Sequence, residues 1–289
     1  STFRMLGGTL KVSGDYDGST TSWDAIFFAS GATIDIQGGT IELLNGTVSN
    51  DFTLSFQQTT TLANLVINKT GKTVLIDGYN VAVGGDITLT AGTFNANGYD
   101  LTAAGNWTNN GGTFTGGSGT LTFTGSGKTI GGSSSTTFAA TTFTDGANYS
   151  INTSSAAPHA SIENLTLNAG STLNVNSGKA LNLNGTSNII NGSLIASDVY
   201  DEVRDIGFNN SSGQLSGTGY INADLQISSG STQLMNDFTF NGDLFLNTGT
   251  LVMTPHTLTV NGSWFNSGAF TSGTGNVILT EQIKRLEEA

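Results

Sequence analysis

Short apolar segments alternate with polar corners along most of the chain. Segments such as ATIDI, TIELL and FTLSF recur from Ala25 onward and are separated by Gly-Gly or Asn-Gly pairs. Within later segments such as STLNVN, apolar residues alternate with Thr, Ser or Asn, which gives a strand one apolar face for burial and one polar face for solvent. Short alternating segments with Gly and Asn between them predict repeated β-strands.

Two distant parts of the chain carry the same pattern. Residues 80–124 align with residues 237–280 with a single one-residue gap, which falls at a Gly-Gly corner. Matched pairs include Asp86 and Asp243, Gly105 and Gly262, Trp107 and Trp264, and Phe114 and Phe270. Equivalent positions therefore keep the same class of side chain, as stacked structural repeats require.

Corners this short and regular favour stacked coils over a sandwich with long crossover connections. One coil cannot bury its inner face alone, so neighbouring coils stack and their inward side chains form continuous columns. The sequence predicts an all-β fold, a single-stranded parallel β-helix (β-solenoid) with roughly twenty residues per coil. We expect a right-handed coil by extension of the crossover rule for parallel strands.

The pattern predicts one continuous solenoid over residues 1–280, with three interruptions. Polar or charged loops are expected near residues 15–24 and 196–208, and a seam near residues 131–160, where Pro158 follows a Ser/Thr-rich stretch. Residues 281–289 change to helix-forming residues, with Ile283 and Leu286 on one face, and predict a short C-terminal helix. This tail is a docked helix, the start of a linker or a non-native extension.

Composition narrows the classes of partner. Only 10% of the 289 residues are charged, the formal net charge is −12, and the nine basic residues are scattered. Nucleic acid and anionic membrane are therefore not expected as partners, and no apolar run is long enough to cross a membrane. Cysteine is absent, which excludes disulfides and thiolate metal sites. No signal-peptide pattern precedes Ser1, so we expect a mature or trimmed N-terminus.

The chain has one dense acidic cluster before the tail. Its candidate ligand-site residues are Asp198, Tyr200, Asp201, Glu202 and Asp205. Paired carboxylates on adjacent coils would suit polysaccharide cleavage, but solvation of a loop explains the cluster equally well. The two histidines, His159 and His256, lie far apart in sequence, and Asp15-x-Asp17-Gly18 lacks the later ligands of a calcium loop. We therefore predict no catalytic residue, cofactor or metal.

Several phrases resemble a known class of protein. These are LANLVINKTGKTVLIDG, DITLTAGTFNANGYDLTAAGNWTNNGGTFTGGSGTLTFTGSGKTIGG and DFTFNGDLFLNTGTLVMTPHTLTVNGSWFNSGAF. In composition and rhythm, over Leu54–Gly132 and Ala223–Thr280, the chain resembles repeats of secreted prokaryotic surface proteins of the adhesin and autotransporter-passenger type. The resemblance implies an extracellular or cell-surface location and a scaffolding or adhesive role.

Two hypotheses of function follow. In the first, the chain is a non-enzymatic extracellular structural protein, a β-solenoid rod that serves as an adhesin stalk, a surface-layer component or a filament subunit. Its expected partners are copies of itself, joined head to tail, and surface glycans. In the alternative, the chain is a carbohydrate-binding or polysaccharide-cleaving β-helix protein that uses the cluster from Asp198 to Asp205.

Overall fold

The computed structural model describes residues 2–13, 24–45, 51–155, 159–198, 204–209, 212–280 and 286–288. These residues form strands, turns and bends and contain no helix. All of the strand pairs described below are parallel, so the predicted all-β parallel β-solenoid is confirmed. The chain divides into two compact units, Ser1–Ala140 with Thr153–Ser155, and Thr141–Asn152 with Ala156–Ala289.

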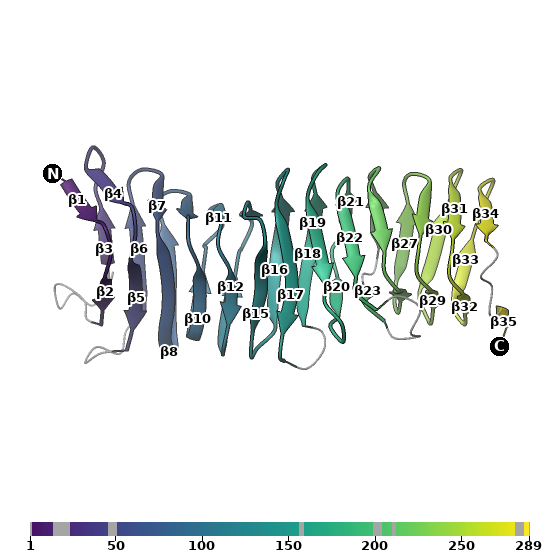
Figure 1. Cartoon of the computed structure of the whole chain (residues 1–289), viewed down its shortest axis with the longest axis horizontal. Helices are drawn as coiled ribbons and strands as arrows, with labels where there is room; N and C mark the ends of the chain where they lie inside the picture. The colour runs from purple at the N-terminus through teal and green to yellow at the C-terminus, as the bar shows by residue number, and fades with distance from the viewer. Residues whose placement is uncertain are drawn as a thin grey trace. The chain divides into compact units, whose positions relative to one another are not determined.

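The first unit is built from three parallel ladders, whose purple to teal strands succeed one another in Figure 1. The first contains β2 (Thr9–Val12), β5 (Thr40–Leu44), the first half of β8 (Asn64–Asp77), the first half of β10 (Ile87–Asn95), β12 (Trp107–Asn109) and β15 (Lys128–Gly132). The second contains β3 (Asp24–Phe28), β6 (Phe52–Phe56), the second halves of β8 and β10, and β13 (Gly112–Thr115). The third contains β7 (Thr60–Leu62), β9 (Val81–Val83), β11 (Leu101–Ala103) and β14 (Thr120–Phe123). In addition, β1 (Thr2–Met5) pairs with β4 (Thr33–Ile36), and β16 (Thr136–Phe143) has residues in both units.

The second unit repeats this plan. One ladder contains β17 (Asn148–Thr153), β19 (Thr172–Val175), β22 (Ser193–Ala196), β25 (Tyr220–Asn222), β28 (Phe238–Phe240), β31 (Thr257–Val260) and β34 (Asn276–Leu279). Another contains the first half of β18 (Ala160–Leu167), β20 (Leu181–Leu183), β23 (Ile206–Phe208), β26 (Leu225–Ile227), β29 (Leu244–Leu246), β32 (Trp264–Asn266) and β35 (Leu286–Glu288). The third contains the end of β18, β21 (Ser187–Ile190), β24 (Gly213–Ser216), β27 (Ser231–Leu234), β30 (Thr250–Met253) and β33 (Ala269–Thr271). One coil therefore supplies one strand to each ladder.

Inward side chains form the predicted apolar columns. Leu225, Leu244 and Trp264 are in register on consecutive strands, and all three are buried. The outward residues between them, such as Phe245, are more exposed, as the alternating pattern of a strand requires. A side chain in the column is covered by its equivalents one coil before and one coil after, so burial depends on stacking.

The internal repeat is visible at the corners of both copies. A Cβ atom on Gly105 would lie 2.3 Å from the carbonyl carbon and oxygen of Gly85, and one on Gly262 would lie 2.4 Å from the oxygen of Gly242. Each glycine lets two consecutive coils approach at a position where any side chain would collide with backbone. In each copy the matched tryptophan packs edge-on against the matched phenylalanine. The ring centroids are 4.9 Å apart for Trp107–Phe114 and 4.8 Å apart for Trp264–Phe270.

Coil length varies where the sequence has interruptions. Equivalent corner residues are 19 positions apart at Asp224 and Asp243 but 27 apart at Asn191 and Thr218. The longer coil holds the charged segment 196–208, whose two ends are strand residues: Ala196 closes β22, and Ile206–Phe208 form β23. Residues 199–203 lie outside the described part of the chain, as do 15–23 and Pro158.

The expected C-terminal helix is not seen. Leu286–Glu288 form strand β35, which pairs in parallel with β32, and residues 281–285 and 289 lie outside the described residues. Nine residues with good helix propensity are too few to hold a helix alone. Pairing with β32 gives Leu286–Glu288 backbone hydrogen bonds in a ladder. The right-handed coil and the single continuous solenoid stay predictions.

Candidate functional site

The described members of the acidic cluster, Asp198 and Asp205, accept hydrogen bonds from neighbouring coils, and we call carboxylates bonded in this way braces. Oδ2 of Asp198 accepts hydrogen bonds from the hydroxyl of Ser177 (3.0 Å) and from the backbone N–H of Gly178 (2.9 Å), one coil earlier. Oδ2 of Asp205, which is buried, accepts the N–H of Asp224, one coil later, at 2.9 Å. The two carboxylates therefore bond to opposite neighbouring coils. Tyr200, Asp201 and Glu202 lie outside the described residues.

Asp205 begins a column of buried carboxylates in the second unit. The N–H of Asp243 donates to Oδ1 of Asp224, and the N–H of Ser263 donates to Oδ1 of Asp243, both at 2.6 Å. All three aspartates are at most 4% exposed. Each carboxylate thus satisfies a backbone donor of the next coil, a charge-assisted bond that pins consecutive corners together.

An equivalent column in the first unit uses amides as well as carboxylates. Oδ1 of Asn64 accepts the N–H of Asp86 (2.8 Å), Oδ1 of Asp86 accepts that of Asn106 (2.8 Å), and Oδ1 of Asn106 accepts that of Thr129 (3.0 Å). Because a neutral amide can replace the carboxylate, the property that these positions share is a side-chain oxygen acceptor. The recurrence of Asp or Asn at one coil spacing was the sequence signal for these columns, and our sequence analysis missed it.

The two histidines have separate surroundings. His159 is buried, and its Nδ1 accepts the backbone N–H of Ala180 at 2.9 Å. Burial, and secondly the positive charge of Lys179, lower the pKa of His159 below its ordinary value. The Nδ1 atom of His256 instead lies 3.8 Å from Oδ1 of Asp237 at the surface. Among the described residues, no three His, Asp or Glu side chains are grouped so that they could hold a metal ion.

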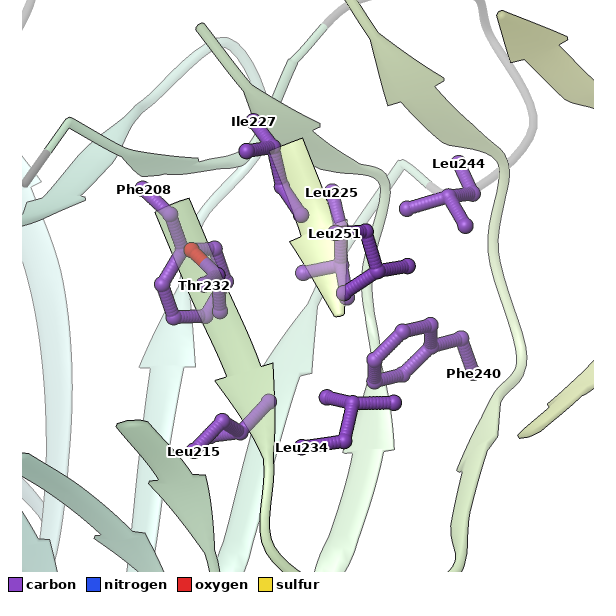
Figure 2. Close-up of a pocket in the computed structure, with 9 residues that line it drawn as sticks. All are labelled: Phe208, Leu215, Leu225, Ile227, Thr232, Leu234, Phe240, Leu244 and Leu251. Atoms are coloured by element: carbon purple, nitrogen blue, oxygen red, sulfur yellow. The ribbon is translucent and has the colours of Figure 1, made fainter. Parts of the chain in front are cut away.

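Figure 2 shows a space in the interior of the second unit. It is too tight to hold a water molecule, and its lining is apolar except for Thr232. In the ladder, Thr232 is in register with Gly213 on one side and with Leu251 on the other. The Oγ1 atom of Thr232 is buried and has no hydrogen-bond partner in the structure. This space is a local packing defect and not a ligand site.

Comparison with protein-family models, with curated proteins and with solved structures found no match to this chain. The described part of the chain contains no helix that is both long and apolar enough to cross a membrane. The structure places the buried carboxylates in hydrogen bonds between coils.

Proposed function

We propose that this chain is a non-enzymatic structural protein, in which the β-solenoid is a scaffold at the cell surface or outside the cell. The observation that carries the proposal is the use of the corner side chains. The buried aspartates of the second unit, including Asp205 from the candidate cluster, accept backbone N–H groups of the following coil. Carboxylates held in this way stabilise the stack and are poorly placed to transfer a proton to a substrate.

The surface location rests on the resemblance to secreted prokaryotic surface repeats, together with the low charge and the Ser, Thr and Asn content of the outward positions. The stalk, surface-layer and filament versions share one physical requirement. The last coil of any solenoid leaves backbone donors and acceptors without partners, and these must be covered by a cap or by another subunit. Joining copies head to tail would cover them and produce a fibre.

Electron microscopy of the purified protein tests this proposal. We expect elongated particles that associate end to end as the protein concentration rises. Elongated particles that stay single would remove the filament version and leave the stalk version standing. Compact particles without a long axis would contradict the scaffold role itself.

The polysaccharide-cleaving alternative has a separate test. A reducing-sugar assay would compare the wild-type chain with Asp201→Ala, which alters the cluster without touching the braces at Asp198 and Asp205. We expect no turnover from either protein. Turnover by the wild type that is lost in Asp201→Ala would replace our proposal with the enzymatic one.

A further inference from the structure

The first unit has a hollow at one corner, formed by three consecutive coils. Its walls come from residues 36–38 at the end of β4, residues 61–64 from the end of β7 to the start of β8, and Gly84 and Gly85 after β9. The hollow has a volume of about 340 Å³, which is at the lower end of the roughly 300–1,000 Å³ of small-molecule sites. A ligand of one or two sugar rings has the size to occupy it.

The lining is uncharged and offers free hydrogen-bonding groups. Gln37 and Thr61 are exposed, and neither Oε1 of Gln37 nor the hydroxyl of Thr61 bonds to another described residue. Ile36 and Ala63 supply apolar surface beside them. Among the described residues, no Asp, Glu, Lys, Arg or His lines the hollow, so they offer no group to balance the charge of an ionic ligand. Amides and a hydroxyl beside a small apolar patch suit a neutral ligand with many hydroxyl groups.

The backbone of the hollow is not available to a peptide strand. The N–H of Gly84 donates to the oxygen of Leu62 at 2.8 Å, and the N–H of Gly85 donates to the oxygen of Ala63 at 2.6 Å. Addition of a strand to a sheet requires unpaired main-chain groups, and these two donors are already used between coils. Side-chain recognition of a small ligand is the chemistry that remains.

In the second copy of the internal repeat, the position of Gly84 carries a side chain. Gly84 aligns with Asn241, and Ala104, one coil later, aligns with Asn261. The Oδ1 atom of Asn241 accepts a hydrogen bond from Nδ2 of Asn261, so two side chains occupy the corner in that copy. A Cβ atom on Gly84 would lie 3.7 Å from the oxygen of Leu62 and 3.9 Å from Cγ2 of Thr61, which are ordinary contacts. The backbone therefore tolerates a side chain at position 84.

We propose that this hollow binds a short neutral saccharide, with Gln37 and Thr61 as its hydrogen-bonding residues and the missing side chain at Gly84 as the feature that keeps it open. The site is shallow and open to solvent, so binding is weak, in the millimolar range. The proposal goes beyond the scaffold role and does not depend on it, because particle shape and saccharide binding are measured separately.

The test is titration of the isotope-labelled full chain with maltose, cellobiose and lactose, followed by backbone amide NMR. We expect at least one disaccharide to shift the amide resonances of Ala63, Gly84 and Gly85, with smaller changes elsewhere. Glucuronate and glucosamine, which carry charge, should bind more weakly. Thr61→Val removes the hydroxyl at constant shape and should weaken binding about tenfold.

Gly84→Asn should abolish binding by installing the side chain found in the second copy. Its thermal unfolding midpoint should equal that of the wild type, which separates a filled hollow from a damaged fold. Thr102→Val is the matched control, because Thr102 lies in the same outward column two coils after Thr61 and away from the hollow. Absence of any shift with all three disaccharides, equal binding of glucuronate, or unchanged binding by Gly84→Asn would each overturn the proposal.

Discussion

The two copies of the internal repeat share their corners but differ in how their aromatic cores are completed. In the first copy, Trp107 is fully buried and its Nε1–H donates to the hydroxyl of Thr136 at 3.2 Å. In the second copy, Trp264 is 7% exposed, and its buried Nε1 has no hydrogen-bond partner among the described residues. Thr136 belongs to the segment that follows the first copy.

Asn109 and Asn266 show the same difference. The Oδ1 atom of Asn109 accepts the N–H groups of Gly111 and Gly112, and its Nδ2 donates to the oxygen of Ser135 at 2.8 Å. The Oδ1 atom of Asn266 is buried and has no hydrogen-bond partner among the described residues. In the first copy, Oδ1 of Asn109 is satisfied within its own corner, whereas Nδ2 of Asn109 and Nε1 of Trp107 donate to residues of the next segment. The comparison teaches that the polar core groups of a coil depend both on its own corner and on the segment that follows.

Substitution of a corner glycine should cause the largest loss of stability, and the loss should be equal in the two copies. Gly105→Ala and Gly262→Ala each place a Cβ atom within 2.5 Å of backbone in the preceding coil. We expect each to lower the free energy of unfolding by about 3 kcal/mol, measured by urea denaturation with circular dichroism. Gly84→Ala is the control, because its Cβ atom has room, and it should change stability little. A mild effect in only one copy would show that the corners are not equivalent.

Loss of a carboxylate acceptor should cost more stability in the second unit than in the first, because the aspartates of the second unit are buried. Asp224→Ala leaves the buried N–H of Asp243 without an acceptor and should cost about 2 kcal/mol of stability. Asp86→Ala affects an exposed N–H, that of Asn106, and should cost about 0.5 kcal/mol. Asp224→Asn keeps an oxygen acceptor and should recover most of the loss. Equal costs at the two aspartates would show that burial does not set the strength of the brace.

Replacement of the matched tryptophans by Phe should lower the free energy of unfolding by about 1 kcal/mol more in the first copy than in the second. Trp107→Phe removes a donor from a buried bond to Thr136, whereas Trp264→Phe removes a donor that has no partner in the structure. Both lose similar apolar volume, so the difference between their unfolding free energies reports the hydrogen bond. We expect Trp107→Phe to be the more damaging of the two. The reverse order would mean that packing around Trp264 is the tighter.

A pH titration should affect the second unit through His159. Because burial lowers the pKa of His159 in the folded state, the unfolded chain binds the proton more readily. Its contribution to stability is complete above about pH 6.5, declines as the pH falls through the folded pKa, and then levels off. His159→Gln retains an acceptor for Ala180 and should flatten this part of the profile, measured as unfolding midpoint against pH. An unchanged profile would mean that other groups cause the decline.

Much of the fold followed from local pattern. Alternation of apolar residues with Thr and Asn, and the glycines at Gly105 and Gly262, predicted stacked coils because these features are properties of single strands and corners. The candidate site did not follow in the same way. Asp198 and Asp205 are close in sequence, yet they bond to Gly178 and Asp224 on different coils. Sequence proximity could not show which neighbouring coil each carboxylate would face.

The sequence by itself determined the repeated strand and corner, because the spacing of apolar residues, the corner glycines and the class of each side chain are properties of a single coil. Only the tertiary structure decided what lies beside each residue about twenty positions away. Pairing with β32 makes a strand of Leu286–Glu288, stacking turns aspartates into buried braces, and three consecutive coils form a hollow that Gly84 lines. These outcomes depend on contacts between coils, which no single segment encodes.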